Sequence, residues 1–256
     1  MKKTLLFCVT ILACLAALNA AETRQALTLP ATGLTSMVID CGAGYLKVRG
    51  QEGLERIEVS AVLHVRGIGE DGLQEFREEN VVLKLEKSGT KAVLTAKIDE
   101  EFSLEKLFGA REAYIDLDVS LPRGLALVID DGSGDLVVRD MAGGLEIDDG
   151  SGDVSLVGIA GAVKIDDGSG DLSLARIEGD IDIEDGSGDI ELKEAGGRVA
   201  IDDGSGQLDV RSVQGPVTVD DGSGDIVIDG VEKDVTIDEA GSGGVEIRNV
   251  KGKVRK

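Results

Sequence analysis

Acidic residues recur through the second half of this 256-residue chain at a spacing that could build a row of cation sites. The motif Asp-Asp-Gly-Ser-Gly-Asp starts at Asp130 and returns every 18 residues, with replacements in some copies. Carboxylate oxygens and turn carbonyls are the ligands that Ca²⁺ prefers. The candidate calcium ligands are the second and third acids of the motifs: Asp131, Asp135, Asp149, Asp153, Asp167, Asp171, Asp185, Asp189, Asp203, Asp221 and Asp225.

The same acids have two other interpretations. Asp and Ser side chains often hydrogen-bond to N–H groups of their own turn, and solvent and salt then screen the charge. Carboxylate pairs also hydrolyse glycosides, but near-identical copies in every repeat argue against a carbohydrate-active enzyme. The calcium-binding nonapeptide repeat has one residue between its last glycine and the acid, whereas Asp135 follows Gly134 directly. We therefore favour hydrogen-bonded turns over a calcium-binding acidic solenoid, and calcium over catalysis.

Apolar residues around the motif indicate the elements that must position these acids. Each repeat has one apolar pair before the motif and one after it, such as Leu145 with Ile147 and Val154 with Leu156. Within a pair the spacing is two, the strand period. A fixed period of this length is typical of solenoids. We predict an all-β fold: a parallel two-sheet β-solenoid with 18-residue coils, of which seven regular ones span residues 125–256.

The regular region also contains a second glycine turn in each repeat and one extra residue in the last repeat. A second turn in each repeat contains a glycine, for example Gly161 and Gly179, which we expect to adopt positive φ. In the last repeat we align Asp238 and Glu239 with the two leading aspartates and treat Ala240 as the extra residue. The tail that follows is basic, and we interpret its lysines as protection against end-to-end strand addition, with docking onto another copy as the alternative.

Residues 21–124 form an irregular, strand-rich N-terminal part with insertions. The segment Ile39-Asp-Cys41 is a worn copy of the repeat, so we expect the solenoid to start near residue 36 and Ile57 to begin the next coil. Helices are predicted over 72–79 and 103–109. We expect the aromatic residues here to cap the open end of the rod, with a partner-binding apolar patch as the alternative; they include Phe76, Phe102 and Phe108.

Residues 1–20 have the pattern of a secretory signal peptide, with Lys2 and Lys3 before an apolar run and Ala20 at the cut. The run is short for a membrane span, so we expect no transmembrane segment after cleavage. Anchoring as a lipoprotein through Cys14 is an alternative. Cleavage leaves Cys41 as the one remaining cysteine, and we favour a buried thiol over a disulfide between chains.

The net charge and the sequence motifs argue against several classes of function. A net charge of −22 argues against nucleic acid or anionic membranes as partners. The single histidine, His64, has no evident catalytic partner in the sequence. The Gly-Ser-Gly turns precede strands and not helices, so they lack the helix N-terminus that a phosphate loop needs. We therefore expect no enzyme and no cofactor other than the calcium considered above.

The recurring Asp-Gly-Ser-Gly-Asp turn, its Gly-Val-x-Ile partner strand and Val119-Ser-Leu-Pro122 resemble the bacterial adhesin-like β-solenoid family, sometimes called the toast-rack domain. The resemblance covers residues 35–254. It implies an exported or cell-envelope location, in the periplasm, outer envelope or outside the cell, and an interaction or scaffolding role. It brings no catalytic residues. We expect a non-enzymatic, monomeric surface scaffold whose partner is an unknown protein, a surface glycan or another envelope component.

Overall fold

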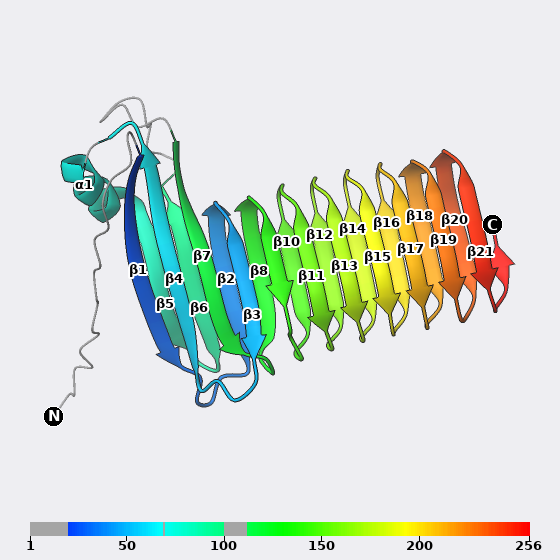
Figure 1. The fold of residues 1–256 in the computed structure, drawn as a ribbon, viewed down its shortest axis with the longest axis horizontal. Helices are drawn as coiled ribbons and strands as arrows, with labels where there is room; N and C mark the ends of the chain where they lie inside the picture. Colours follow the sequence, from blue (N-terminus) through cyan, green and yellow to red (C-terminus); the bar gives the residue numbers. More distant parts are fainter. Residues whose placement is uncertain (1–19, 69, 100–111) are drawn as a thin grey trace.

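The computed structural model describes residues 20–68, 70–99 and 112–256. In this part of the chain two eleven-stranded sheets, here called sheet A and sheet B, face one another along a rod (Figure 1). The predicted signal peptide and the predicted helix over 103–109, with Phe102 and Phe108, lie outside the described residues. No helix among the described residues is long and apolar enough to cross a membrane.

The regular part of the rod alternates between the two sheets, one strand in each per coil. Its sheet A strands are β9 (Leu136–Arg139), β11 (Val154–Ile159), β13 (Leu172–Ile177), β15 (Ile190–Ala195), β17 (Leu208–Val213), β19 (Ile226–Val231) and β21 (Val245–Val250). Its sheet B strands are β8 (Ala126–Ser133), β10 (Leu145–Asp149), β12 (Val163–Asp167), β14 (Ile181–Asp185), β16 (Val199–Asp203), β18 (Val217–Ser223), β20 (Val235–Ser242) and β22 (Val254–Arg255). Neighbouring coils pair in parallel, as predicted.

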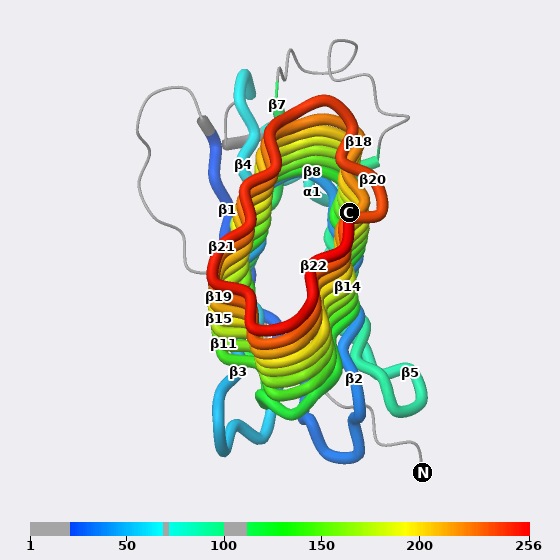
Figure 2. Tube along the Cα trace, turned by 90° about the vertical axis from the view of Figure 1, so that its right-hand side faces the viewer, coloured from blue at the N-terminus to red at the C-terminus, as the bar shows by residue number. Residues whose placement is uncertain are grey.

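The apolar columns fill the space between the sheets. Ile147 pairs in register with Ile165, and both are buried. Viewed along the rod, the coils stack as closed oval rings (Figure 2). Because each buried Val, Leu or Ile contributes roughly 1.5–3 kcal/mol, these columns are the main source of stability. The predicted two-sheet solenoid with 18-residue coils is therefore confirmed.

The N-terminal part adds strands to one end of the rod. They are β1 (Ala20–Pro30), β2 (Ser36–Ala43), β3 (Leu46–Gln51), β4 (Arg56–Arg66), β5 (Val81–Ser88), β6 (Lys91–Ile98) and β7 (Glu112–Pro122), with α1 (Glu70–Asn80) between β4 and β5. Strands β2 and β3 form a coil that pairs in parallel with β8 and β9, so Cys41 lies beside Asp131 in the ladder. This confirms that the solenoid begins near residue 36.

The prediction that Ile57 starts the next coil is wrong. Strand β4, which holds Ile57, pairs antiparallel with β1 and β7 and so belongs to the cap. It runs on for eleven residues without the glycine turn that closes a coil. The strands that extend the coils outward are β6 and β7, which pair in parallel with β2 and β3.

Antiparallel strands and one helix close this end of the rod. Strand β1 forms the edge of sheet A and β5 the edge of sheet B, and α1 contacts both. Phe76 and Leu73 of α1 are buried in the core. The helix therefore covers apolar surface that a terminal coil would expose, as the cap interpretation predicts for Phe76.

Glycines serve two different purposes in the two turns. In the first turn Gly170 and Gly188 have φ of 143° and 151°, a region that favours glycine. In the second turn Gly161 and Gly179 do not have positive φ, contrary to prediction; a Cβ on Gly179 would lie 2.3 Å from the carbonyl oxygen of Gly161. The second-turn glycines are thus required by close stacking of coils and not by dihedral angle.

The last repeat contains a bulge that changes its alignment. The register between β18 and β20 shifts after Val219, so Asp220 pairs with Glu239 and Asp221 pairs with Ala240. The extra residue is therefore Asp238, and our placing of Glu239 beside Asp221 is wrong. The consequence is that an uncharged side chain follows the last buried aspartate of the column described below.

Candidate functional site

Six aspartates point into the rod and form what we call the inner aspartate column. They are the second acids of the motifs: Asp131, Asp149, Asp167, Asp185, Asp203 and Asp221. Their side chains follow the buried apolar pair of each sheet B strand by one strand period, so alternation carries them to the inner face. Each is 1–6% exposed. Consecutive members pair in register through sheet B, with Cys41 before the first and Ala240 after the last.

Each carboxyl of the inner column is only partly satisfied by the protein. In four coils Oδ1 accepts a hydrogen bond from the N–H of the serine two residues later, at 3.0–3.1 Å; the acceptors are Asp167, Asp185, Asp203 and Asp221. This is the Asx-turn geometry favoured from the sequence. Their Oδ2 atoms are buried without a hydrogen-bond partner in the protein, as are both oxygens of Asp131 and Asp149. An ionised carboxylate could accept about four hydrogen bonds. Each inner aspartate therefore accepts far fewer hydrogen bonds from the protein than its ionised form could.

Burial and mutual repulsion raise the pKa of this column. Loss of solvation is the largest cause, and neighbouring carboxylates add to it for Asp149 and Asp185, whose pKa values rise to about 7. The pKa values of Asp131, Asp167 and Asp203 rise to about 6, and that of Asp221 is also raised. Two charges on adjacent parallel strands, about 4.8 Å apart, repel by about 3.5 kcal/mol at an effective dielectric of 20.

The third acids of the motifs, which we call the turn aspartates, lie on the outside. Asp135, Asp153, Asp171, Asp189 and Asp225 are all exposed. Four of them link successive coils, because Oδ1 accepts a hydrogen bond from the N–H of the corresponding residue in the next coil at 2.8–3.0 Å. The acceptor and donor residues are Asp153 and Asp171, Asp171 and Asp189, Asp189 and Gln207, and Asp225 and Gly244. These bonds hold the turns in register.

The eleven predicted calcium ligands therefore divide into a buried set and an exposed set. Four of the six inner aspartates direct one oxygen to a serine N–H, and four of the five turn aspartates direct one to the next coil. Among the described residues, no group of three or more His, Cys, Asp or Glu side chains is placed to hold one metal ion. The bonds of the inner aspartates are the predicted bonds within one turn, whereas those of the turn aspartates reach the next coil. Calcium binding stays an untested prediction.

Cys41 occupies the inner position of the β2–β3 coil, next to Asp131. The thiol is buried, as expected, and Sγ donates to the carbonyl oxygen of Asp130 at 3.7 Å. Burial and then the nearby carboxylates raise its pKa well above the usual range. Because the thiolate is the reactive form, this cysteine is chemically inert in the folded rod.

A groove of about 980 Å³ runs across five coils on the sheet A side of the second turns. Buried Ile177 and Val213 contribute to its lining, together with exposed Arg176, Glu194 and Glu232. At this place the sheet ladder skips one residue in each coil, for example between the pairs Val157 with Ala175 and Ile159 with Ile177. The skipped residues have left-handed φ of 52–79°: Asp140, Gly158, Arg176, Glu194, Ser212, Gly230 and Asn249. The groove follows this repeated interruption of the ladder.

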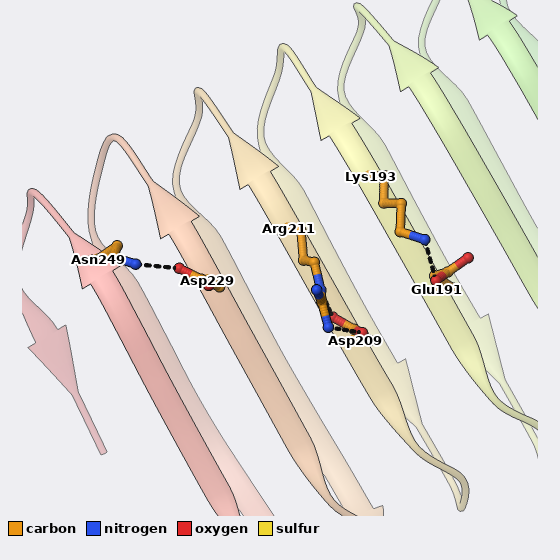
Figure 3. Close-up of polar contacts among 6 residues, drawn as sticks. All are labelled: Glu191, Lys193, Asp209, Arg211, Asp229 and Asn249. Carbon is orange, nitrogen blue, oxygen red and sulfur yellow. Dashed lines mark hydrogen bonds and ion pairs between the residues drawn. The ribbon is translucent and has the colours of Figure 1, made fainter.

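The outer face of sheet A carries local ion pairs beside this groove. Arg211 binds both oxygens of Asp209 at 2.6 and 2.7 Å, Lys193 pairs with Glu191, and Asn249 donates to Asp229 (Figure 3). Exposed pairs of this kind contribute about 0–1 kcal/mol each. Their importance is that they neutralise charge on this face, whereas the turn edge of sheet B remains acidic.

His64 lies on the outer face of the cap and has partners that the sequence did not reveal. Its Nε2 is 3.0 Å from Asp116 Oδ2 and its Nδ1 is 3.3 Å from Glu22 Oε1. The ring stacks on Tyr114 with centroids 4.7 Å apart. These contacts join three neighbouring strands of the cap, β1, β4 and β7.

Comparison with solved structures finds several similar chains at low sequence identity. The chain is similar to a proposed cell adhesion protein from Clostridium sporogenes, with 13% identity over 92% of this chain and all of the other, and a TM-score of 0.43. It is also similar to a proposed adhesin from Bacteroides fragilis, with 11% identity over 91% and 96% of the two chains and a TM-score of 0.37. A proposed lipid binding protein from Parabacteroides distasonis has 10% identity over 91% and 97% and a TM-score of 0.39.

No protein of curated function matches this chain. A family match covers residues 77–216, which include the inner part of the cap and five of the regular coils. The matched region thus contains the Asp-Gly-Ser-Gly turns, most of the inner aspartate column and most of the groove. By this match the chain belongs to the Toastrack DUF4097 family.

Proposed function

We propose that this protein is an exported, non-enzymatic scaffold of the cell envelope that holds an extended macromolecule in the groove along its second turns. The groove is the observation that carries the proposal, because it is continuous across five coils and is built by the same backbone feature in each. A non-glycine residue in the left-handed region costs about 1–2 kcal/mol. The rod repeats this cost at Arg176, Glu194 and Ser212, all of which line the groove.

The lining of the groove indicates the chemistry of its ligand. The lining contains small residues such as Ala160, Gly196 and Gly230, together with charged side chains of both signs. The small residues leave room for a backbone or a sugar ring, and the two arginines and three glutamates of the lining provide donors and acceptors. An extended polypeptide or glycan from the envelope fits this description better than a compact organic ligand.

The same lining supports a binding role in place of catalysis. Among the described residues that line the groove there is no histidine, cysteine, lysine or tyrosine. The carboxylates that are present, on Glu178, Glu194 and Glu232, come from three different coils. A catalytic centre needs a nucleophile or an acid–base pair of distinct environments at one point, whereas this groove offers similar environments along its length.

Site-specific crosslinking tests the groove as the binding surface. A benzophenone side chain at exposed Gln214, in the groove, is expected to capture an envelope component on irradiation of cells or envelope fractions. The same group at Thr218, on the outer face of sheet B, is the control and should capture less of it. Equal capture from both positions, or none from Gln214, would contradict the proposal.

Charge reversal provides an independent test of affinity. The double variant Glu194→Lys and Glu232→Lys is expected to lose binding of the captured component. Its matched control is Glu146→Lys with Asp182→Lys, which makes two reversals at exposed positions of sheet B. Retained binding in the first variant would contradict the groove as the binding surface, and equal loss in both variants would assign the interaction to net charge.

Export is tested separately from binding. The full chain is expected in the cell envelope or medium with its first 20 residues removed, whereas a chain starting at Ala21 should stay in the cytoplasm. N-terminal sequencing of the recovered protein locates the cut. Lipid attachment at Cys14 would be visible as a mass increase and retention in membranes, and would replace the cleaved, unanchored form expected here.

A further inference from the structure

The inner aspartate column is an unusual concentration of buried acid without a counter-charge. Its six carboxyls are at least nine-tenths buried, and no lysine, arginine or histidine is buried anywhere in the described residues. Sheet A, which faces the column across the rod, contributes only apolar side chains to the buried interior. Because an ionised carboxyl in such surroundings is normally paired with a cation or loses its charge, something other than a basic side chain must neutralise the column.

The charged groups nearest the column increase its need for neutralisation. All of those that act on it are acids or a thiol: the column members themselves, Cys41, the outward aspartates of the same strands Asp130, Asp148, Asp166, Asp202 and Asp220, and the turn aspartates Asp153, Asp171 and Asp189. The opposing contributions come only from the thiol and backbone N–H groups, such as Ser187 beside Asp185. Neither supplies a positive charge.

The hydrogen-bonding pattern points to a small ligand. Oδ2 of every member is buried and has no partner in the protein. The described acids also do not gather into groups of three that would surround a metal ion. A proton needs only one oxygen, and it removes the charge at the atom where it binds.

We propose that the inner aspartate column is a proton-binding file, in which neutral carboxylic acids alternate with carboxylates near neutral pH and the remaining protons are released one after another as the pH rises. Alternation places the remaining charges two coils apart, about 9.6 Å, where their repulsion is half of that between neighbours. The file would make the sheet B edge of the rod sensitive to pH across its whole length, because loss of one proton makes loss of its neighbours' protons less favourable.

The raised pKa values fix the direction of the effect. A carboxyl whose pKa is higher in the folded than in the unfolded chain stabilises the fold in its protonated form. That contribution is fully present below the unfolded value near 4 and is lost as the pH rises through the folded values of about 6 to 7. The rod should therefore be less stable at pH 8 than at pH 5.

Neighbouring residues in one coil provide a matched pair of variants. Asp185→Asn removes a buried carboxyl while keeping an oxygen for the Ser187 N–H, and Glu184→Gln removes the adjacent exposed one. Urea unfolding gives the equilibrium constant of unfolding at pH 5 and at pH 8. The factor by which this constant increases from pH 5 to pH 8 should be at least about tenfold smaller in D185N than in the natural protein. E184Q should change it much less. Equal behaviour of the two variants would overturn the proposal.

Direct titration tests the file without relying on a variant. In a protein labelled with ¹³C at the aspartate side-chain carboxyl, a set of signals should titrate above pH 5.5, and D185N should remove one and shift its neighbours to lower pH. Titration of every aspartate signal below pH 5 would overturn the proposal. So would millimolar calcium or magnesium at pH 8 restoring the stability of the natural protein but not of D185N, since a metal would then replace the proton.

Discussion

The backbone N–H of Asp171 donates to Oδ1 of Asp153, which lies 18 residues earlier in the chain, over 3.0 Å. The same bond joins Asp171 to Asp189 and Asp189 to Gln207. A side chain that the sequence offers as a metal ligand thus serves as a clamp between coils. It satisfies a turn N–H that the sheet ladder does not reach.

Removing one clamp should cost about as much as one exposed hydrogen bond. We expect Asp153→Ala to be less stable than Asp153→Asn by about 1 kcal/mol, because Asn keeps the acceptor for the Asp171 N–H. Both variants lose the same negative charge, so their difference isolates the hydrogen bond. Urea unfolding at one pH measures it, and equal stability of the two variants would show that the bond contributes nothing.

Glycine in the first turn should be irreplaceable in the middle of the rod. A Cβ on Gly188, at φ of 151°, would lie 1.8 Å from the carbonyl oxygen of Gly170. We expect Gly188→Ala to lower the free energy of unfolding by about 3 kcal/mol or more, through strain and forced separation of coils. Gly144→Ala is the control, because its Cβ would come no nearer than 3.6 Å to other atoms. Comparable losses in both would exclude backbone crowding as the cause.

The solenoid could be predicted because two periods coincide in the sequence. Strand spacing within each pair, as in Leu145 and Ile147, and the 18-residue return to Val163 and Ile165 leave one arrangement that buries every member. The same alternation also carries Asp149 inward, so the inner column could have been read from the sequence. We treated the second and third acids of the motif as one set of candidate ligands and placed neither inside the rod. The regular ladder buries the second acid although an unpaired buried carboxyl is unfavourable.

Other features had no sequence signal that could reveal them. The left-handed position near the end of the sheet A strands is occupied by Arg176, Glu194 and Ser212, which share neither size nor charge. The pairing of β4 with β1 and β7 depends on strands far apart in the chain. In the last coil, either Asp238 or Ala240 could be the inserted residue, and only the ladder register decides between them.

Core truncation should have a larger effect in the middle of the rod than at its end. Ile165 is fully buried between two neighbouring coils, whereas Ile247 in the last sheet A strand is only partly buried. We expect Ile165→Ala to destabilise by about 2–5 kcal/mol and Ile247→Ala by less, because a terminal repeat has one neighbour. Urea unfolding gives the totals. Faster hydrogen exchange should spread to coils on both sides for I165A and stay near the C-terminus for I247A; the same pattern in both would contradict nearest-neighbour coupling.

Calcium should leave the stability of the rod unchanged at neutral pH. In the Asp167–Asp171 turn one oxygen of the inner aspartate already binds a serine N–H, and Oδ1 of the turn aspartate binds the next coil. We therefore expect the same melting temperature in EDTA and in millimolar calcium, at matched ionic strength because the net charge of −22 makes the chain sensitive to general screening. Magnesium is the control for non-specific divalent binding. If calcium alone raises the melting temperature and Asp153→Asn abolishes the increase, the turn aspartates are calcium ligands and the hydrogen-bonded clamp is a secondary role.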